Sequence, residues 1–245
     1  MTSIRSKLHR FLFDTYVQDP SRFPVPTSLV LGWNTLKRRA IRRFRVRHTL
    51  QVSSFGGAGT TLLTNFLQRH GADLPDQRGA RWAPWKHMSA PPENRVVPSG
   101  FRAIYVIGDP RDALLSVFRR GYQHAHVQLM EGRVHEWDFT WKLTEYLAEG
   151  RELFGFGEHF DRWVRSDRNY PILVVKYDAL WDNLPEIIRF AGLPESVLQD
   201  FPERKPRATD RQHYPPEITA RVDRMLGELA ERIDRYPDFS IIGTP

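Results

Sequence analysis

A chain of 245 residues is long enough to bury one sizeable core, and its composition excludes several classes of protein. The absence of cysteine rules out disulfides, a thiolate nucleophile and cysteine-ligated zinc, and it fits a reducing compartment. No apolar stretch approaches the roughly 18 residues that a membrane span requires, and the first residues lack the apolar segment of a secretory signal. We therefore expect a single cytoplasmic domain, 1–245, that at most touches a membrane surface.

The formal net charge of +7 comes from one short segment. Residues 37–48 hold seven of the 36 Lys and Arg residues and no acidic residue, which leaves 29 basic residues against 29 acidic ones elsewhere. Such a run attracts nucleic acid, an acidic lipid surface or an anionic substrate, although a solvated helix end explains it equally well. It closes a predicted N-terminal extension, 1–47, that consists of a helix, a proline-broken loop and a second, basic helix.

The rest of the chain alternates between apolar runs and amphipathic segments. The expected elements are, in order, a strand near 48–54, a helix near 60–70, an edge or second strand within 80–88, a strand over 101–107, a helix from Pro110 capped by Asp109, a helical cover over 121–168, a strand over 171–177, a helix over 178–191 and a final helix over 217–236. This alternation predicts a three-layer α/β/α fold with a central parallel sheet.

The most informative segment joins the first strand to its helix. It contains, in order, Gly56, Gly57, Ala58, Gly59, Thr60 and Thr61. Glycines let the backbone turn tightly and approach a ligand, and the first amides of a helix attract an anion. A plain strand-to-helix connection does not need three glycines in four residues, so the segment predicts a phosphate or sulfate site. A threonine follows the last glycine where ordinary ATP- and GTP-binding loops have lysine.

Four separated segments resemble, in the same order, sulfotransferases that use 3′-phosphoadenosine 5′-phosphosulfate. Gly59-Thr60-Thr61 matches the end of the family's P-K-S-G-T-T loop, and Lys86-His87 resembles its K-x-H segment. The segment 105–116 resembles Y-V-I-R-D-P-R-D-x-x-x-S, and 174–194 resembles a strand end V-x-Y-E-D-L with a helix end F-L-G-L-P. The resemblance implies a P-loop-like sulfotransferase architecture.

The resemblance also implies a role for each matching residue. The loop residues 56–61 would bind the 5′-phosphosulfate of the co-substrate, Ser116 its 3′-phosphate and Tyr177 its adenine, while Arg204 and Lys205 would clamp the 3′-phosphate. His87, with Lys86 beside it, would take the proton from a hydroxyl-bearing small-molecule or glycan acceptor. Taken alone, Ser116, Tyr177 and His87 are each explained as well by a structural role.

Two residues of the family pattern are missing. Gly57 stands where the loop has lysine, and Gly108 where the 3′-phosphate segment has arginine. We predict that a cation from elsewhere lies near Gly57, the candidates being Lys86, Arg81, Arg102 and the basic run 37–48. No metal is expected, because the pair His124 and His126 lacks a third ligand nearby.

Two other functions remain open on the sequence. The first is an ATP-dependent small-molecule kinase of similar fold, in which Asp109 would hold Mg²⁺. The second is a non-catalytic protein that binds a nucleotide or an anionic surface, the latter through residues 37–48. The acceptor pocket of a sulfotransferase would come from 1–35 and 121–168, where no motif identifies the acceptor.

Overall fold

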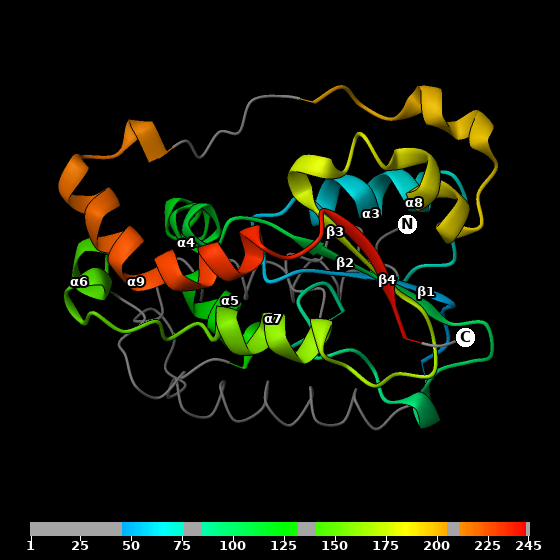
Figure 1. Ribbon diagram of the computed structural model, residues 1–245, viewed down its shortest axis with the longest axis horizontal. Helices are drawn as coiled ribbons and strands as arrows, with labels where there is room; N and C mark the ends of the chain where they lie inside the picture. The colour runs from blue at the N-terminus through cyan, green and yellow to red at the C-terminus, as the bar shows by residue number, and fades with distance from the viewer. Residues whose placement is uncertain (1–45, 76–84, 132–140, 205–210, 244–245) are drawn as a thin grey trace, which may run out of the picture.

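The computed structural model describes residues 46–75, 85–131, 141–204 and 211–243 (Figure 1). Most of the N-terminal extension and of the basic run lies outside these ranges, as do Arg81 and Lys205. The predictions made for them therefore stay predictions. Within the described ranges, no helix is both long and apolar enough to cross a membrane.

A central sheet of four strands runs through the described part of the chain, in the order β1-β2-β3-β4. The strands are β1 (Leu50–Ser53), β2 (Arg102–Ile107), β3 (Ile172–Lys176) and β4 (Phe239–Ile242). The first three are parallel, with Ser53 opposite Tyr105 and Tyr105 opposite Val174. They correspond to the strands expected near 48–54, 101–107 and 171–177, so the predicted α/β class with a parallel sheet is confirmed.

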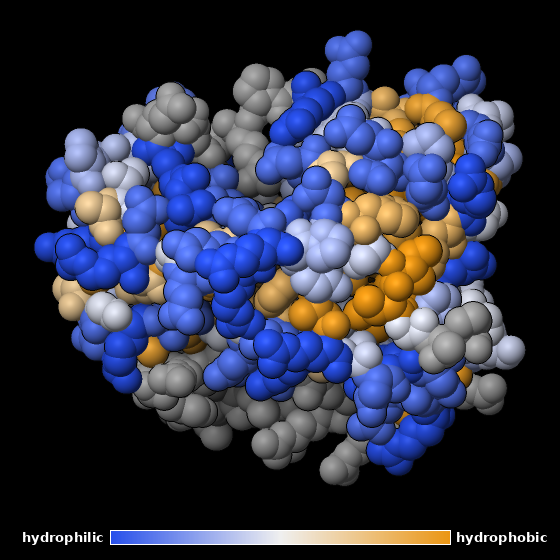
Figure 2. All heavy atoms as spheres, in the orientation of Figure 1, coloured by the Kyte–Doolittle hydropathy of each residue, from blue (hydrophilic) through white to orange (hydrophobic). Residues whose placement is uncertain are grey.

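β4 is an addition that the sequence did not predict. It pairs antiparallel with β3, Ile242 lying opposite Ile172. Its four residues are partly or fully exposed, so it lacks the continuous apolar character of a central strand. Figure 2 shows apolar atoms gathered on this face of the molecule over β4, where Ile241 is 54% exposed.

Helices cover both faces of the sheet. They are α3 (Thr60–Arg69), α4 (Pro110–Arg119), α5 (Gln123–Met130), α6 (Leu143–Ala148), α7 (Phe156–Val164), α8 (Leu184–Ala191) and α9 (Pro216–Asp234), with 3-10 turns η2 (Asn94–Val96), η3 (Tyr177–Ala179), η4 (Glu195–Asp200) and η5 (Arg211–His213). Side chains of β2 alternate between two cores: Ile104 and Val106 pack with α3 and α8, whereas Tyr105 and Ile107 pack with α4, α5, α7 and α9. This alternation produces three layers (Figure 1).

Of three local predictions, two differ from the structure and one is confirmed. The helix expected from residue 178 begins only at Leu184, because η3 and a turn follow β3 and Pro185 occupies the first turn of α8. The possible strand within 80–88 is absent from its described part, since residues 85–87 form a turn. The cap at Asp109 is confirmed, because its carboxylate accepts a hydrogen bond from the Arg111 amide at 2.8 Å.

The start of α7 depends on one half-buried carboxylate. Glu152 accepts hydrogen bonds from the amides of Phe154 (2.6 Å), Gly155 (3.0 Å) and Phe156 (3.1 Å), and burial raises its pKa to about 7. Replacing Glu152 with alanine is expected to lower the free energy of unfolding by about 2 kcal/mol, because these donors lose their partner.

Urea denaturation measures this loss. Glu149→Ala is the matched control, since Glu149 is exposed at the end of α6 and its truncation is expected to stay within about 0.5 kcal/mol of the wild type. Equal stabilities of the two variants would contradict the role given to Glu152.

Candidate anion-binding and catalytic site

The glycine loop leaves the carboxyl end of β1 and leads directly into α3. Gly56, Gly57 and Gly59 have φ of 101°, 67° and 68°, values that residues with a side chain rarely adopt. Gly59 is the N-cap of α3 and supplies no side-chain cap. The first amides of α3 therefore have no side-chain partner from the cap position, as an anion site requires.

The two threonines of the loop have different environments. The Thr60 hydroxyl is buried and lies 2.5 Å from the Ser54 hydroxyl, which also accepts a hydrogen bond from the Gly56 amide at 3.0 Å. Thr61 is exposed and accepts a hydrogen bond from the Lys86 ammonium. Thr60 thus ties the loop to β1, and Thr61 is the hydroxyl that faces outward beside a cation.

Close packing leaves little room for a side chain at Gly57 or Gly108, the two positions where the resembled pattern has lysine and arginine. A Cβ atom at Gly57 would lie 2.8 Å from the Ala113 Cα of α4, closer than non-bonded atoms approach. A Cβ atom at Gly108 would lie 3.0 Å from the Ala58 Cβ. Gly57 therefore packs directly on the backbone of α4 and Gly108 on the methyl group of Ala58, and a side chain at either position would force these segments apart.

Lys86 brings a cation to the loop from another segment. Residues 85–88 run beside the end of β1, where the Ser54 amide donates to the Lys86 carbonyl at 3.2 Å. The Lys86 ammonium reaches Thr61 in the first turn of α3. Burial, and then the charge of Arg120, lower the pKa of Lys86 to about 8. Within the described part of the chain Lys86 forms no ion pair with an acidic residue.

Of the other cations proposed to replace the missing pair, Arg102 lies elsewhere. It stands at the opposite end of β2, where its guanidinium donates to the Phe190 carbonyl at 2.7 Å and lies against Gly192. This interaction satisfies the end of α8, so the prediction of a site role for Arg102 is wrong. Arg81 and residues 37–45 are outside the described residues.

Arg120 is a further candidate for the site, and the sequence analysis did not name it. It caps the C-terminal end of α4, donates from Nε to the Ser116 carbonyl at 2.9 Å, and lies 5.5 Å from the centre of the Tyr122 ring. The charge of Arg120 is close enough to lower the pKa of Lys86. Arg120 itself is exposed. The sequence signal was its position one helical turn after Ser116.

His87 has the tautomer that a base requires. Its Nδ1 lies 2.8 Å from the Ser54 carbonyl, and a carbonyl only accepts, so Nδ1 carries the proton and Nε2 the lone pair. Burial, followed by the neighbouring His126 and Lys86, holds the pKa of His87 well below its usual range. The imidazole is therefore neutral at pH 7, with Nε2 ready to accept a proton.

The residues assigned to the nucleotide lie around the same loop. Ser116 is buried on α4, one turn after the Ala113 that contacts Gly57. The Tyr177 ring lies over Gly59, where an added Cβ would be 2.3 Å from Cε2, and it meets the Trp181 ring edge-on at 5.3 Å. The strand ends thus gather these residues at one edge of the sheet.

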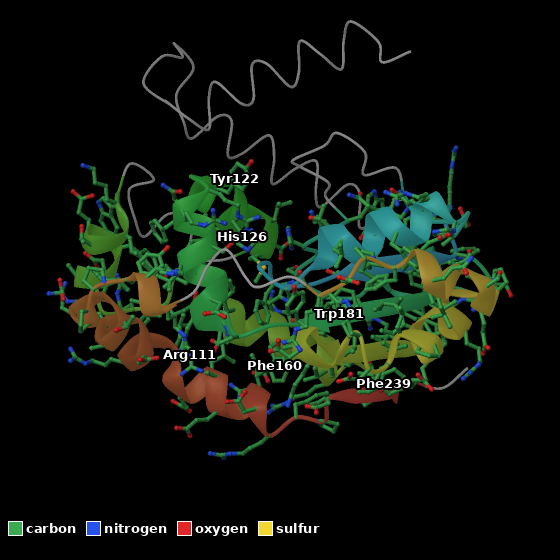
Figure 3. All side chains as sticks on the ribbon, turned by 90° about the horizontal axis from the view of Figure 1, so that it is seen from above. Arg111, Tyr122, His126, Phe160, Trp181 and Phe239 are labelled. Carbon is green, nitrogen blue, oxygen red and sulfur yellow. The ribbon has the colours of Figure 1, made fainter. Side chains whose placement is uncertain are left out.

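Arg204 is close to this group but already has a partner. Its guanidinium donates to the Asp178 carboxylate at 2.5 Å and lies 5.6 Å from the centre of the Trp181 ring. Figure 3 shows Trp181 on the side of α8, away from the His126 and Tyr122 labels near α5.

The described residues contain no group of three or more potential metal ligands, and the side chain of His124 is outside them.

Similarity of this chain to known proteins is found by structure and not by sequence. No protein-family model and no curated protein matches the sequence. Among solved structures, the crystal structure of mouse sulfotransferase SULT7A1 complexed with PAP aligns with 81% of this chain and 91% of that chain. The aligned residues are 14% identical and the TM-score is 0.48, so this likeness does not place the chain in a family.

Proposed function

We propose that the chain is a sulfotransferase that transfers a sulfuryl group from 3′-phosphoadenosine 5′-phosphosulfate to a hydroxyl on a small molecule or glycan. The observation that carries this proposal is the neighbouring pair Lys86 and His87. One residue brings a cation to the first turn of α3, and the other presents a neutral imidazole beside the same loop. A cation and a base at an anion cradle are what sulfuryl transfer requires.

Each group has a defined task in the proposed reaction. The amides of residues 57–61 and the Thr61 hydroxyl hold the phosphosulfate, while Lys86 and Arg120 balance its charge. As the acceptor oxygen forms a bond to sulfur, His87 Nε2 takes its proton. The bond between sulfur and the 5′-phosphate oxygen breaks, and 3′-phosphoadenosine 5′-phosphate leaves as an anion stabilised by Lys86.

The remaining residues bind the nucleotide part of the donor. The 3′-phosphate is bound by Ser116, Arg204 and Lys205. Tyr177 lies against the adenine, whose flat face suits an aromatic ring. Arg204 is paired with Asp178 in the structure. To bind the 3′-phosphate, the guanidinium must contact both Asp178 and the phosphate, or leave Asp178 for the phosphate. No step of this scheme uses a metal ion.

The kinase alternative finds less support in the site. Its magnesium ligand would be Asp109, whose carboxylate caps α4 and pairs with Arg111 at 2.7 Å and Arg211 at 3.3 Å. A carboxylate with two cationic partners is a poor ligand for Mg²⁺. The non-catalytic alternative based on residues 37–48 falls largely outside the described residues.

Calorimetry with two nucleotides tests the proposal directly. We expect 3′-phosphoadenosine 5′-phosphate to bind with a submillimolar Kd, and ATP with Mg²⁺ to bind much more weakly. Preference for ATP with Mg²⁺ would overturn the proposal in favour of the kinase. Steep salt dependence of binding, unchanged in His87→Ala, would favour the anionic-surface protein instead.

The lowered pKa of Lys86 predicts a pH dependence of nucleotide binding. Lys86 loses its proton as the pH rises through about 8, so an anion binds less tightly above that value. The Kd for 3′-phosphoadenosine 5′-phosphate is expected to be about tenfold higher at pH 9 than at pH 7, which calorimetry at both values measures.

The matched control for this prediction is Lys86→Arg, because a guanidinium stays charged throughout that range. Its Kd is expected to be nearly constant between pH 7 and pH 9. The same loss of affinity in both proteins would show that another group is titrating.

A further inference from the structure

His126 is a buried polar residue that the proposed reaction does not use. It lies on α5 and is 5% exposed, packed against the aromatic rings of Phe154 and Phe156. Its Nε2 is 2.6 Å from the Phe55 carbonyl, so this nitrogen carries a proton and donates it. Phe55 immediately precedes Gly56, so α5 contacts the glycine loop where the loop begins.

The ring of His126 also shapes the backbone at Gly56. An added Cβ at that glycine would lie 2.3 Å from His126 Cε1 and 2.6 Å from Nε2. The imidazole therefore occupies the space in which any other residue would place its side chain. The donor and the ring together fix the first two residues of the loop.

His126 and His87 hold consecutive carbonyl groups. His87 Nδ1 donates to the Ser54 carbonyl at 2.8 Å, and His126 Nε2 donates to the next one, at Phe55. The two rings meet edge-on with centroids 4.8 Å apart. A shift of either imidazole therefore moves the loop, the other imidazole, or both.

We propose that His126 is a positioning residue, which fixes the start of the glycine loop and orients the imidazole of His87 toward its role as base. It acts through the Phe55 carbonyl and through ring contact, and does not itself touch the reacting atoms. The catalytic meaning of this assignment rests on the proposed function, whereas the coupling of the two histidines does not.

The contact has an electrostatic consequence. Two imidazoles at this distance do not both hold a second proton readily, and after burial the neighbouring His126 is the largest cause of the lowered pKa of His87. The other ionisable groups that face the pair are Lys86 and His159, with Arg120 beside Lys86. Removing the His126 ring should therefore raise the pKa of His87 while those groups remain.

Two substitutions separate the donor of His126 from its ring. His126→Gln keeps an N–H that reaches the Phe55 carbonyl but has no titrating group. His126→Phe keeps a ring and loses the donor. The control is His70→Gln, because His70 follows the C-terminal end of α3, far along the helix from the loop. All variants are made in the full chain.

Proton NMR titration of histidine-labelled protein follows His87 without any need for turnover. The measured quantity is the pH at the midpoint of the His87 titration. We expect this pH to lie below 6.5 in the wild type, to rise in His126→Gln and to be unchanged in His70→Gln. Calorimetry should give a Kd for 3′-phosphoadenosine 5′-phosphate within about threefold of the wild type for His126→Gln, and about tenfold weaker for His126→Phe.

An unchanged midpoint of His87 in His126→Gln would overturn the inference, and this variant remains informative if His126→Phe fails to fold. Equal nucleotide affinities of His126→Phe and wild type would also overturn it. If the wild type does not bind the nucleotide but the midpoint of His87 still rises in His126→Gln, the proposed function fails and the coupling stands. The two failures are thus distinguishable.

Discussion

Replacing His87 with glutamine is expected to lower the rate of sulfuryl transfer by about 10²–10⁴-fold, because the acceptor hydroxyl loses its base. Glutamine can still donate an amide proton to the Ser54 carbonyl, to which His87 Nδ1 is bound, so the loop keeps its support. The Kd for 3′-phosphoadenosine 5′-phosphate should therefore stay within about threefold of the wild type.

The measurement is the release of 3′-phosphoadenosine 5′-phosphate from the donor in the presence of a panel of phenols, alcohols and saccharides. Acceptor-dependent release distinguishes transfer from slow hydrolysis of the donor. His70→Gln again serves as the control, with an expected rate equal to that of the wild type. A His87→Gln variant that transfers at the wild-type rate would remove His87 from the mechanism.

Replacing Gly59 with alanine is expected to cost roughly 4 kcal/mol of unfolding free energy, from two separate causes. An alanine at a φ of 68° costs about 1–2 kcal/mol. Its Cβ would also lie 2.3 Å from the Tyr177 ring, and displacing that ring adds about 1–3 kcal/mol. Because Tyr177 is assigned to the adenine, nucleotide binding should weaken at the same time.

Gly71→Ala isolates the backbone cost of this change. Gly71 has a φ of 91°, and an added Cβ there has no atom within 4 Å. Urea denaturation should show a loss of only about 1–2 kcal/mol for this variant. In a double-mutant cycle, Tyr177→Ala should restore part of the stability lost in Gly59→Ala. Equal losses for Gly59→Ala and Gly71→Ala would show that the ring contact has no effect.

The elements that the sequence predicts well are those with a strong local signal. β2 and α4 followed from an unbroken apolar run and from a cap residue placed before a proline, and the structure has both where they were expected. β4 has no such run, and it exists because its backbone completes the edge of β3. The late start of α8 was missed because tertiary packing gives the residues after β3 a 3-10 turn.

The candidate site divides in the same way. The glycine loop and the pair Lys86 and His87 could be proposed from the sequence because each lies within a few consecutive residues. Arg120 was not considered, and His126 was considered only as half of a metal-binding pair, because their positions depend on how α4 and α5 pack against the loop. The hydroxyl of Thr60 faces the hydroxyl of Ser54. This contact depends on the path of the backbone, so the residue types alone do not predict it.

Gly57 lies against the Ala113 backbone, and Gly108 lies against the methyl group of Ala58. The shape and the positive charge of the proposed anion site consequently come from separate segments: the loop provides the shape, and the turn at 85–87 provides the ammonium. Selection can alter the strength of anion binding through that turn while the contour is preserved. The same separation makes this scaffold suitable for exchanging the cation without rebuilding the loop.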